Sequence, residues 1–187
     1  MERPVESEPQ SGPAIFERFR RAAAALYAAV APLSDEQLLA RPPDGGWAKR
    51  DILAHIAADH RWWAGQLAAL AAARLPSPDE CYAIPGPPPA GYDMATPDGR
   101  NAWQFEQHKS QPLPEIHNAL LHYRARIIEL AEMLPAGEFA APYAIVESGY
   151  TGQVRPAQPG EQGFPLWQWF RGNTWHHYED HLPDLQA

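Results

Sequence analysis

The sequence predicts an all-α protein, a four-helix bundle with two long loop insertions rich in proline and glycine. Apolar residues recur at helical spacing in four long segments, and no segment gives a strand signal strong enough for a sheet. The chain has 187 residues, which suits one domain with a sizeable core. We expect a disordered tail over residues 1–12, which are polar and lack periodicity, and a single domain over residues 13–187.

The first helix is expected over residues 14–30, where apolar side chains form one stripe and Pro32 follows. Ser34 and Gln37 then make a capping-box pattern, which predicts a short helical turn through Leu39.

The second helix is expected over residues 47–73. Asp51 lies in its first turn, where a carboxylate interacts favourably with the helix dipole. His55 lies one turn later among apolar neighbours, so it should point inward or along the edge of the core, with Asp59 a further turn along the same face.

Two segments are expected to be long loops. Residues 75–99 contain seven prolines and cannot be helical in their middle, so we expect an ordered flap there. Residues 136–163 contain four glycines before Gly163 and three prolines, with a single strand-like fragment at 143–146. Thr96 reads as the N-cap of the helix that follows the first loop.

The third helix is expected in two pieces, residues 98–110 and 113–134, which are separated by prolines. The fourth is expected to start near Pro165 and to end before Pro183.

Charge and composition argue against several classes of partner. The formal net charge of -8 predicts no binding to nucleic acid, which requires a basic face. No apolar run reaches the roughly 18 residues of a membrane-spanning helix, and the N-terminus lacks an apolar core like that of a signal peptide. We therefore expect a cytoplasmic protein that does not bind membranes. Cys81 is the only cysteine, so an internal disulfide is impossible.

The histidines suggest a metal site. His177 and His181 are four residues apart, so they lie on one face of the fourth helix and can bind one ion together. His55 of the second helix is the best third ligand. Imidazoles are common ligands of zinc and nickel, and three protein ligands leave a position open for water or substrate. Asp59 can serve as a fourth ligand or as an acceptor that orients an imidazole N–H.

Other interpretations of the histidines remain open. Eight histidines in this chain readily produce an i,i+4 pair by chance, so the pair can also be a surface cluster. His176 and Asp180 form a competing pair with the same spacing. The remaining histidines are expected to face solvent or to be hydrogen-bonded in the core; they are His60, His108, His117 and His122.

The segment from Trp47 to His55, read W-A-K-R-D-I-L-A-H, resembles the start of the second helix in the DinB-like superfamily. That superfamily includes bacillithiol- and mycothiol-dependent transferases and maleylpyruvate isomerases. The resemblance implies a four-helix bundle in which His55, His177 and His181 bind a divalent metal. It also implies a low-molecular-weight thiol as a candidate co-substrate.

Residues 172–179, read G-N-T-W-H-H-Y-E, are similar to a segment of the ClbS/DfsB branch of the same fold. A member of that branch protects cells against a reactive genotoxin. His181 is a departure from that branch, which generally lacks the second histidine, and it favours a metal-competent site here.

Three functions follow from these observations. The first is a metal-dependent enzyme, a thiol-dependent S-transferase or a hydrolase, in detoxification or stress response. The second is a module that binds or sequesters a small molecule without metal chemistry. The third is a structural or dimerising helical protein, which exposure of Trp62 and Trp167 would favour. A homodimer is compatible with each of them.

Overall fold

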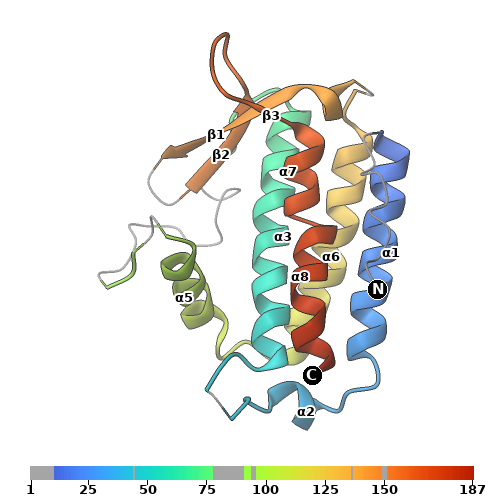
Figure 1. Cartoon of the computed structure of the whole chain (residues 1–187), viewed down its shortest axis with the longest axis vertical. Helices are drawn as coiled ribbons and strands as arrows, with labels where there is room; N and C mark the ends of the chain where they lie inside the picture. The colour runs from blue at the N-terminus through green and yellow to red at the C-terminus, as the bar shows by residue number, and fades with distance from the viewer. Residues whose placement is uncertain (1–10, 44, 78–90, 94–95, 136, 149–150) are drawn as a thin grey trace, which may run out of the picture.

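The computed structural model describes residues 11–43, 45–77, 91–93, 96–135, 137–148 and 151–187. Within them the chain forms the four-helix bundle that the sequence predicts (Figure 1). The bundle consists of α1 (Gly12–Val30), α3 (Lys49–Ala71), α6 (Leu113–Glu132) and the successive pair α7 (Leu166–Gly172) and α8 (Trp175–Gln186). The helix α3 packs against α6 and α8, and α1 packs against α8.

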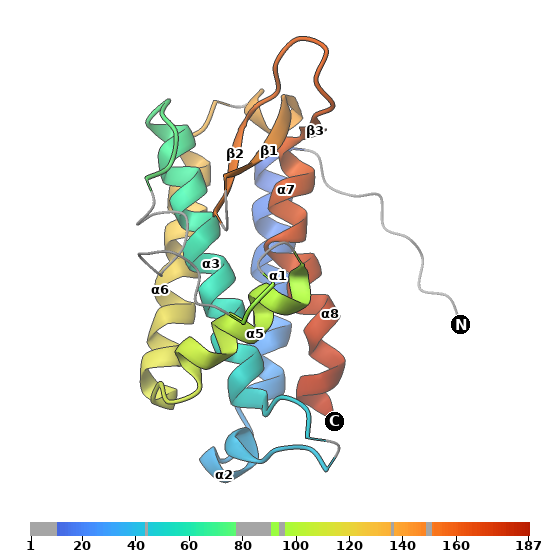
Figure 2. The ribbon, with the colours of Figure 1, turned by 90° about the vertical axis from the view of Figure 1, so that its left-hand side faces the viewer.

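Among the described residues, two further helices lie outside the bundle. The short α2 (Asp35–Leu39) has the expected capping box, in which the Ser34 hydroxyl accepts the Gln37 N–H. The helix α5 (Pro97–His108) begins after Thr96, whose hydroxyl accepts the Gly99 N–H as predicted. Figure 2 shows α5 lying across the outer side of α3, so this first piece of the expected third helix is an added layer and not part of the bundle.

The core is filled by apolar side chains from every bundle helix. Phe19, Ile56, Ile127 and Phe170 come from four different helices, and each is fully buried. Each such side chain stabilises the fold by roughly 1.5–3 kcal/mol relative to exposure. The Asp51 carboxylate accepts the Ala48 N–H and so caps the start of α3, as its position predicts.

The expectation of a long loop without a sheet over residues 136–163 is wrong. After a short 3-10 turn, η1 (Glu138–Ala140), strand β1 (Pro142–Ser148) pairs antiparallel with β2 (Thr151–Pro156) and with β3 (Phe164–Pro165). The second strand contains glycine and proline, so its intrinsic preference is weak. Tertiary contacts supply the rest, because the Gln66 side chain of α3 accepts the Val154 N–H at 2.8 Å.

The fourth helix differs from its prediction in two ways. It breaks at Thr174, whose φ and ψ of -136° and -101° are not helical. The Thr174 hydroxyl donates to the Phe170 carbonyl at 2.6 Å, a local bond that competes with the helix ladder. At the other end, Pro183 lies inside α8 instead of ending it. The Lys49 ammonium stabilises that last turn by donating to the carbonyls of residues 184 and 185, where a cation suits the helix dipole.

Two expectations fall on residues outside the described ranges. The tail expected over residues 1–12 falls mostly on residues 1–10, which lie outside the described ranges, and Gly12 already belongs to α1. Most of the expected flap, residues 78–90 and 94–95, is likewise outside the description. Among the described residues, no helix is both long enough and apolar enough to cross a membrane.

Candidate metal centre

The structure brings His55, His177 and His181 together between α3 and α8. The Nε2 atom of His177 lies 3.0 Å from Nε2 of His55 and 3.1 Å from Nε2 of His181. One nitrogen from each ring lies within 4.8 Å of the other two. Because α3 and α8 are neighbours in the bundle and His177 and His181 share one face of α8, residues 122 positions apart in the sequence meet at one point.

The tautomer of His55 is fixed by Gln104 of α5. The Nδ1 atom of His55 lies 2.8 Å from the Gln104 Oε1 atom, which can only accept. Nδ1 therefore carries the proton, and Nε2 presents its lone pair to the other two rings. The Gln104 amide nitrogen donates to Asp59 Oδ1 at 3.1 Å, which fixes the orientation of the amide.

Asp59 lies beside two of the three histidines. Its Oδ2 atom is 3.5 Å from His177 Nδ1 and 3.7 Å from His55 Nε2. The negative charge near His177 Nδ1 favours a proton on that nitrogen and leaves the His177 Nε2 lone pair directed at His55. This placement favours the orienting role of Asp59 over that of a fourth ligand.

Burial favours the neutral form of His177 and His181. Burial lowers the pKa of His177 from 6.5 to about 4; the Asp59 charge opposes this shift, and His55 and His181 add to it. Burial also lowers the pKa of His181, and His55 again contributes. Neutral imidazoles are the form that binds metals.

In these tautomers the Nε2 atoms of His55 and His177 cannot hydrogen-bond to each other. When His55 and His177 both carry their protons on Nδ1, two lone pairs face each other 3.0 Å apart. A cation between them satisfies both. The set of three converging imidazole nitrogens therefore fits a divalent ion that favours imidazole, such as zinc or nickel.

Aromatic side chains flank the histidines on the α5 side. The rings of Trp47 and Phe105 are stacked with centroids 6.1 Å apart, and Trp47 also contacts the His55 ring edge to face. The guanidinium of Arg41 lies 5.3 Å from the Phe105 centroid. A small cavity of about 10 Å³ lies between α3 and α5, enough for about one water, and His55 and Gln104 help to line it.

The other histidines lie away from this cluster. His176 Nδ1 pairs with Asp180 at 2.9 Å on the outer side of α8, so the competing pair exists but is separate. His108 is hydrogen-bonded to Gln111, as expected. The expectation for His60 is wrong, because His60 is fully buried and neither of its ring nitrogens has a hydrogen-bond partner among the described residues.

Sequence reasoning missed Gln104. It lies on a helix outside the bundle, and no spacing relates it to His55, so only the packing of α5 on α3 reveals its role. Trp62 and Trp167 are half-buried against the core, which removes the feature expected to favour a purely structural role.

Solved structures of other proteins share this fold. The colibactin self-resistance protein ClbS, solved in complex with double-stranded DNA, is 9% identical, with 96% of this chain and 95% of ClbS covered and a TM-score of 0.67. An uncharacterised protein of Escherichia coli UTI89 is 11% identical, with coverages of 95% and 92% and a TM-score of 0.63. YfiT of Bacillus subtilis, described as a probable metal-dependent hydrolase with an unusual four-helix bundle topology, is 18% identical, with coverages of 99% and 90% and a TM-score of 0.57.

The ClbS structure corrects one expectation. We inferred from the net charge of -8 that nucleic acid is excluded as a partner. That inference is wrong for this fold, because ClbS was solved with double-stranded DNA. Net charge describes the whole chain and does not determine what one local surface binds.

A comparison with curated proteins found no similar sequence. The model of the mycothiol maleylpyruvate isomerase N-terminal domain, in contrast, matches residues 19–149, which include His55 and most of the bundle. This match agrees with the DinB-like resemblance of the second helix. The chain therefore belongs to the family of the mycothiol maleylpyruvate isomerase N-terminal domain, a DinB-like family.

Proposed function

We propose that His55, His177 and His181 together bind one divalent metal ion, zinc or nickel, and that the protein is a metal-dependent enzyme. The observation that carries this proposal is the meeting of three imidazole nitrogens, with the Nε2 atom of His177 3.0 Å from that of His55 and 3.1 Å from that of His181. Zinc–nitrogen bonds of about 2.0–2.1 Å at tetrahedral angles separate two ligand nitrogens by about 3.4 Å. The histidines therefore need only small movements to take up an ion.

The surrounding residues support the ligands. Gln104 holds the proton of His55 on Nδ1, and Asp59 favours a proton on Nδ1 of His177, so both rings direct Nε2 to the same point. A bound divalent ion would lower the pKa of a water or thiol that reaches it and so make it a nucleophile near neutral pH. Trp47 and Phe105 cover one side of the cluster and limit the approach of solvent there.

The reaction we propose is attack by an activated water or thiol on a small electrophile, in detoxification or stress response. Family membership supports a thiol such as mycothiol, and the fold shared with YfiT supports hydrolysis. The second candidate is a protein that sequesters a small molecule, as a protection protein would. The stacked Trp47 and Phe105 rings, with Arg41 over one of them, favour it because they place apolar side chains beside the histidines.

The test is the metal content of tag-free protein by inductively coupled plasma mass spectrometry. We expect about one zinc or nickel ion per chain in the wild type, as three histidine ligands imply. His177→Ala should lose it, whereas the control His176→Ala should keep it, because His176 pairs with Asp180 outside the cluster. Metal-loaded protein is then tested for hydrolysis of activated esters and for conjugation of thiols to electrophiles.

Absence of metal from the wild type, even after reconstitution, would overturn the metal proposal and leave the sequestration candidate. Equal metal content in wild type and His177→Ala would place the metal elsewhere in the chain.

A further inference from the structure

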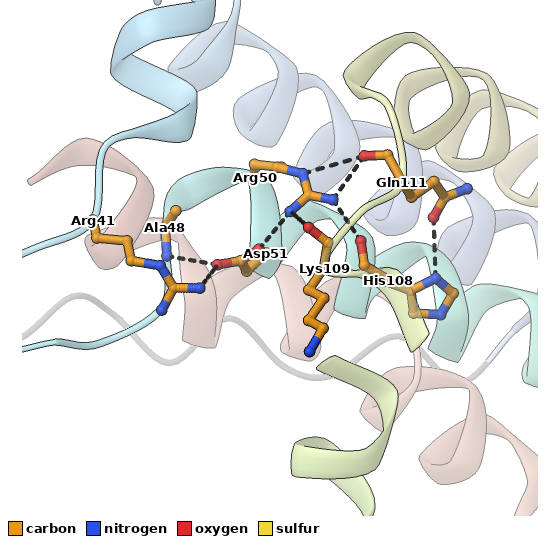
Figure 3. Close-up of polar contacts among 7 residues, drawn as sticks. All are labelled: Arg41, Ala48, Arg50, Asp51, His108, Lys109 and Gln111. Atoms are coloured by element: carbon orange, nitrogen blue, oxygen red, sulfur yellow. Dashed lines mark hydrogen bonds and ion pairs between the residues drawn. The ribbon is translucent and has the colours of Figure 1, made fainter. Parts of the chain in front are cut away.

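The guanidinium of Arg50, in the first turn of α3, is satisfied entirely by protein groups. Figure 3 shows its position between the start of α3 and the segment that joins α5 to α6. Its Nε donates to the Gln111 carbonyl at 3.2 Å, and its Nη2 donates to the carbonyls of His108 and Gln111 at 2.5 and 2.7 Å. Its Nη1 donates to the Lys109 carbonyl at 2.6 Å and to Asp51 Oδ1 at 3.1 Å. All five N–H donors of the side chain are thus used.

Two of the carbonyl groups bound by Arg50, those of His108 and Lys109, belong to the end of α5, and the third, that of Gln111, belongs to the segment that joins α5 to α6. The last carbonyls of a helix lack partners within the helix and carry partial negative charge, so a cation placed there stabilises the end. Arg50 is only 8% exposed, and the capping carboxylate Asp51 balances its charge. A charge that is both buried and fully paired holds its partners in one geometry, because loss of any contact leaves a buried group unsatisfied.

This contact connects the end of α5 with the metal centre. Gln104 lies four residues before His108, one turn from the carbonyl groups that Arg50 binds. A helix rises 1.5 Å per residue, so a shift of α5 by even one residue would remove the 2.8 Å contact between Gln104 and His55.

We propose that Arg50 is a positioning residue for the metal centre: it holds α5 in the place that lets Gln104 fix the tautomer of His55. The proposal rests on the metal-binding function proposed above. Arg50 itself touches none of the three histidines among the contacts described, and the contacts that link it to His55 run through α5 and Gln104.

The experiment uses two variants of Arg50 and one control in the full-length protein. Arg50→Met removes the charge and every donor. Arg50→Lys keeps the charge, but its single ammonium cannot span carbonyls of three residues. Arg61→Met is the matched control. Arg61 is exposed on the same helix, and its charge, like that of Arg50, lowers the pKa of His108.

Two readouts are measured. Cobalt is titrated into each metal-free protein, and the visible absorption spectrum of the bound ion reports affinity and coordination. Long-range nitrogen–proton correlation NMR of the metal-free proteins reports which nitrogen of His55 carries the proton. We expect cobalt affinity to fall about tenfold or more in Arg50→Met and to recover only partly in Arg50→Lys, in line with losses on removing groups that orient metal ligands. His55 should be protonated on Nδ1 in the wild type and should populate both tautomers in Arg50→Met.

The proposal is overturned if Arg50→Met retains the wild-type affinity and tautomer, or if Arg61→Met shows equal losses. It is also overturned if Arg50→Met and Arg50→Lys both unfold the whole bundle, since Arg50 would then be a general folding residue. Failure of the metal proposal can be distinguished from failure of this one. If the metal proposal fails, the wild type binds no cobalt, and the NMR measurement still shows whether Arg50 controls the His55 tautomer.

Discussion

His55 and His60 lie five residues apart on α3, and both are buried, at 7% and 0% exposure. Each approaches α8, where His55 meets His177 and His60 packs against the ring of Tyr178 at 5.1 Å between centroids. His55 has a hydrogen-bond partner on one ring nitrogen and two converging imidazoles on the other side. His60 has the rings of Phe19 and Tyr178 around it and, among the described residues, no hydrogen-bond partner on either nitrogen.

The difference shows that burial alone does not assemble a candidate metal site. Burial lowers the pKa of His60 from 6.5 to about 3 and that of His177 to about 4, so both rings are neutral at neutral pH. Only at His177 do other lone pairs converge, with Gln104 and Asp59 holding the protons on the far nitrogens. The predictions below test whether the surroundings of His55 and His177 differ in this way from those of His60 and Tyr178.

The largest expected effect is on metal-dependent stability. Free zinc at about 1,000 times its dissociation constant should raise the free energy of unfolding by about 4 kcal/mol, because only the folded chain assembles the three ligands. His181→Ala should lose this increase, whereas His60→Leu should keep it. Urea unfolding followed by circular dichroism, with zinc and with EDTA, measures both. An equal zinc effect in His181→Ala would show that His181 is not a ligand.

Gln104→Leu should weaken metal binding by about 10- to 100-fold, because it removes the acceptor that holds the His55 proton on Nδ1. The matched control is Gln107→Leu, the same change at an exposed position of α5. Competition with a chromophoric chelator measures the affinities. Equal affinity in the two variants would mean that the Gln104 contact does not govern the tautomer.

The three histidines could be brought together from the sequence because regular geometry relates them. The spacing of His177 and His181 requires only a helix, and neighbouring helices of a small bundle supply His55. Gln104 could not be found in this way, since its helix lies outside the bundle and its position depends on Arg50 and on packing.

The differences between the predicted and the observed helices and strands have the same origin, because they also depend on individual side-chain contacts. Thr174 breaks the last helix through a side-chain bond to Phe170, and Val154 pairs in a strand partly because Gln66 accepts its N–H. Neither bond has a sequence signal. The Gln66 bond depends on the fold, which brings α3 to β2, and the Thr174 bond depends on the rotamer that the Thr174 side chain adopts. The fold class was accessible because it depends on the periodic pattern of the whole chain, and the family was accessible because the segment from Trp47 to His55 carries the resemblance to it.

The pH dependence of stability should differ between the wild type and His60→Leu. The folded-state pKa of His60 is about 3 and the unfolded value is 6.5, so the unfolded chain binds the proton more tightly. Stability therefore falls as pH drops below about 6.5, and His60 alone should contribute a loss of about 2 kcal/mol between pH 7 and pH 5. Urea unfolding in EDTA at both pH values should show a loss smaller by that amount in His60→Leu. An equal loss of stability in both proteins would contradict the conclusion that His60 is buried in the neutral form without a hydrogen-bond partner among the described residues.

The smallest expected effect concerns the hydroxyl of Tyr178, which is buried without a hydrogen-bond partner among the described residues. Burying an unpaired hydroxyl costs roughly 1–3 kcal/mol, so Tyr178→Phe should raise the free energy of unfolding by about 1 kcal/mol. Tyr143→Phe is the matched opposite, because the Tyr143 hydroxyl donates to the Glu138 carboxylate and its loss should lower stability by a similar amount. Denaturant unfolding of both variants measures the two changes. Destabilisation by Tyr178→Phe would show that the Tyr178 hydroxyl is hydrogen-bonded in solution. The interior around His60 and Tyr178 would then be a second polar region of the bundle, not an apolar part of the core.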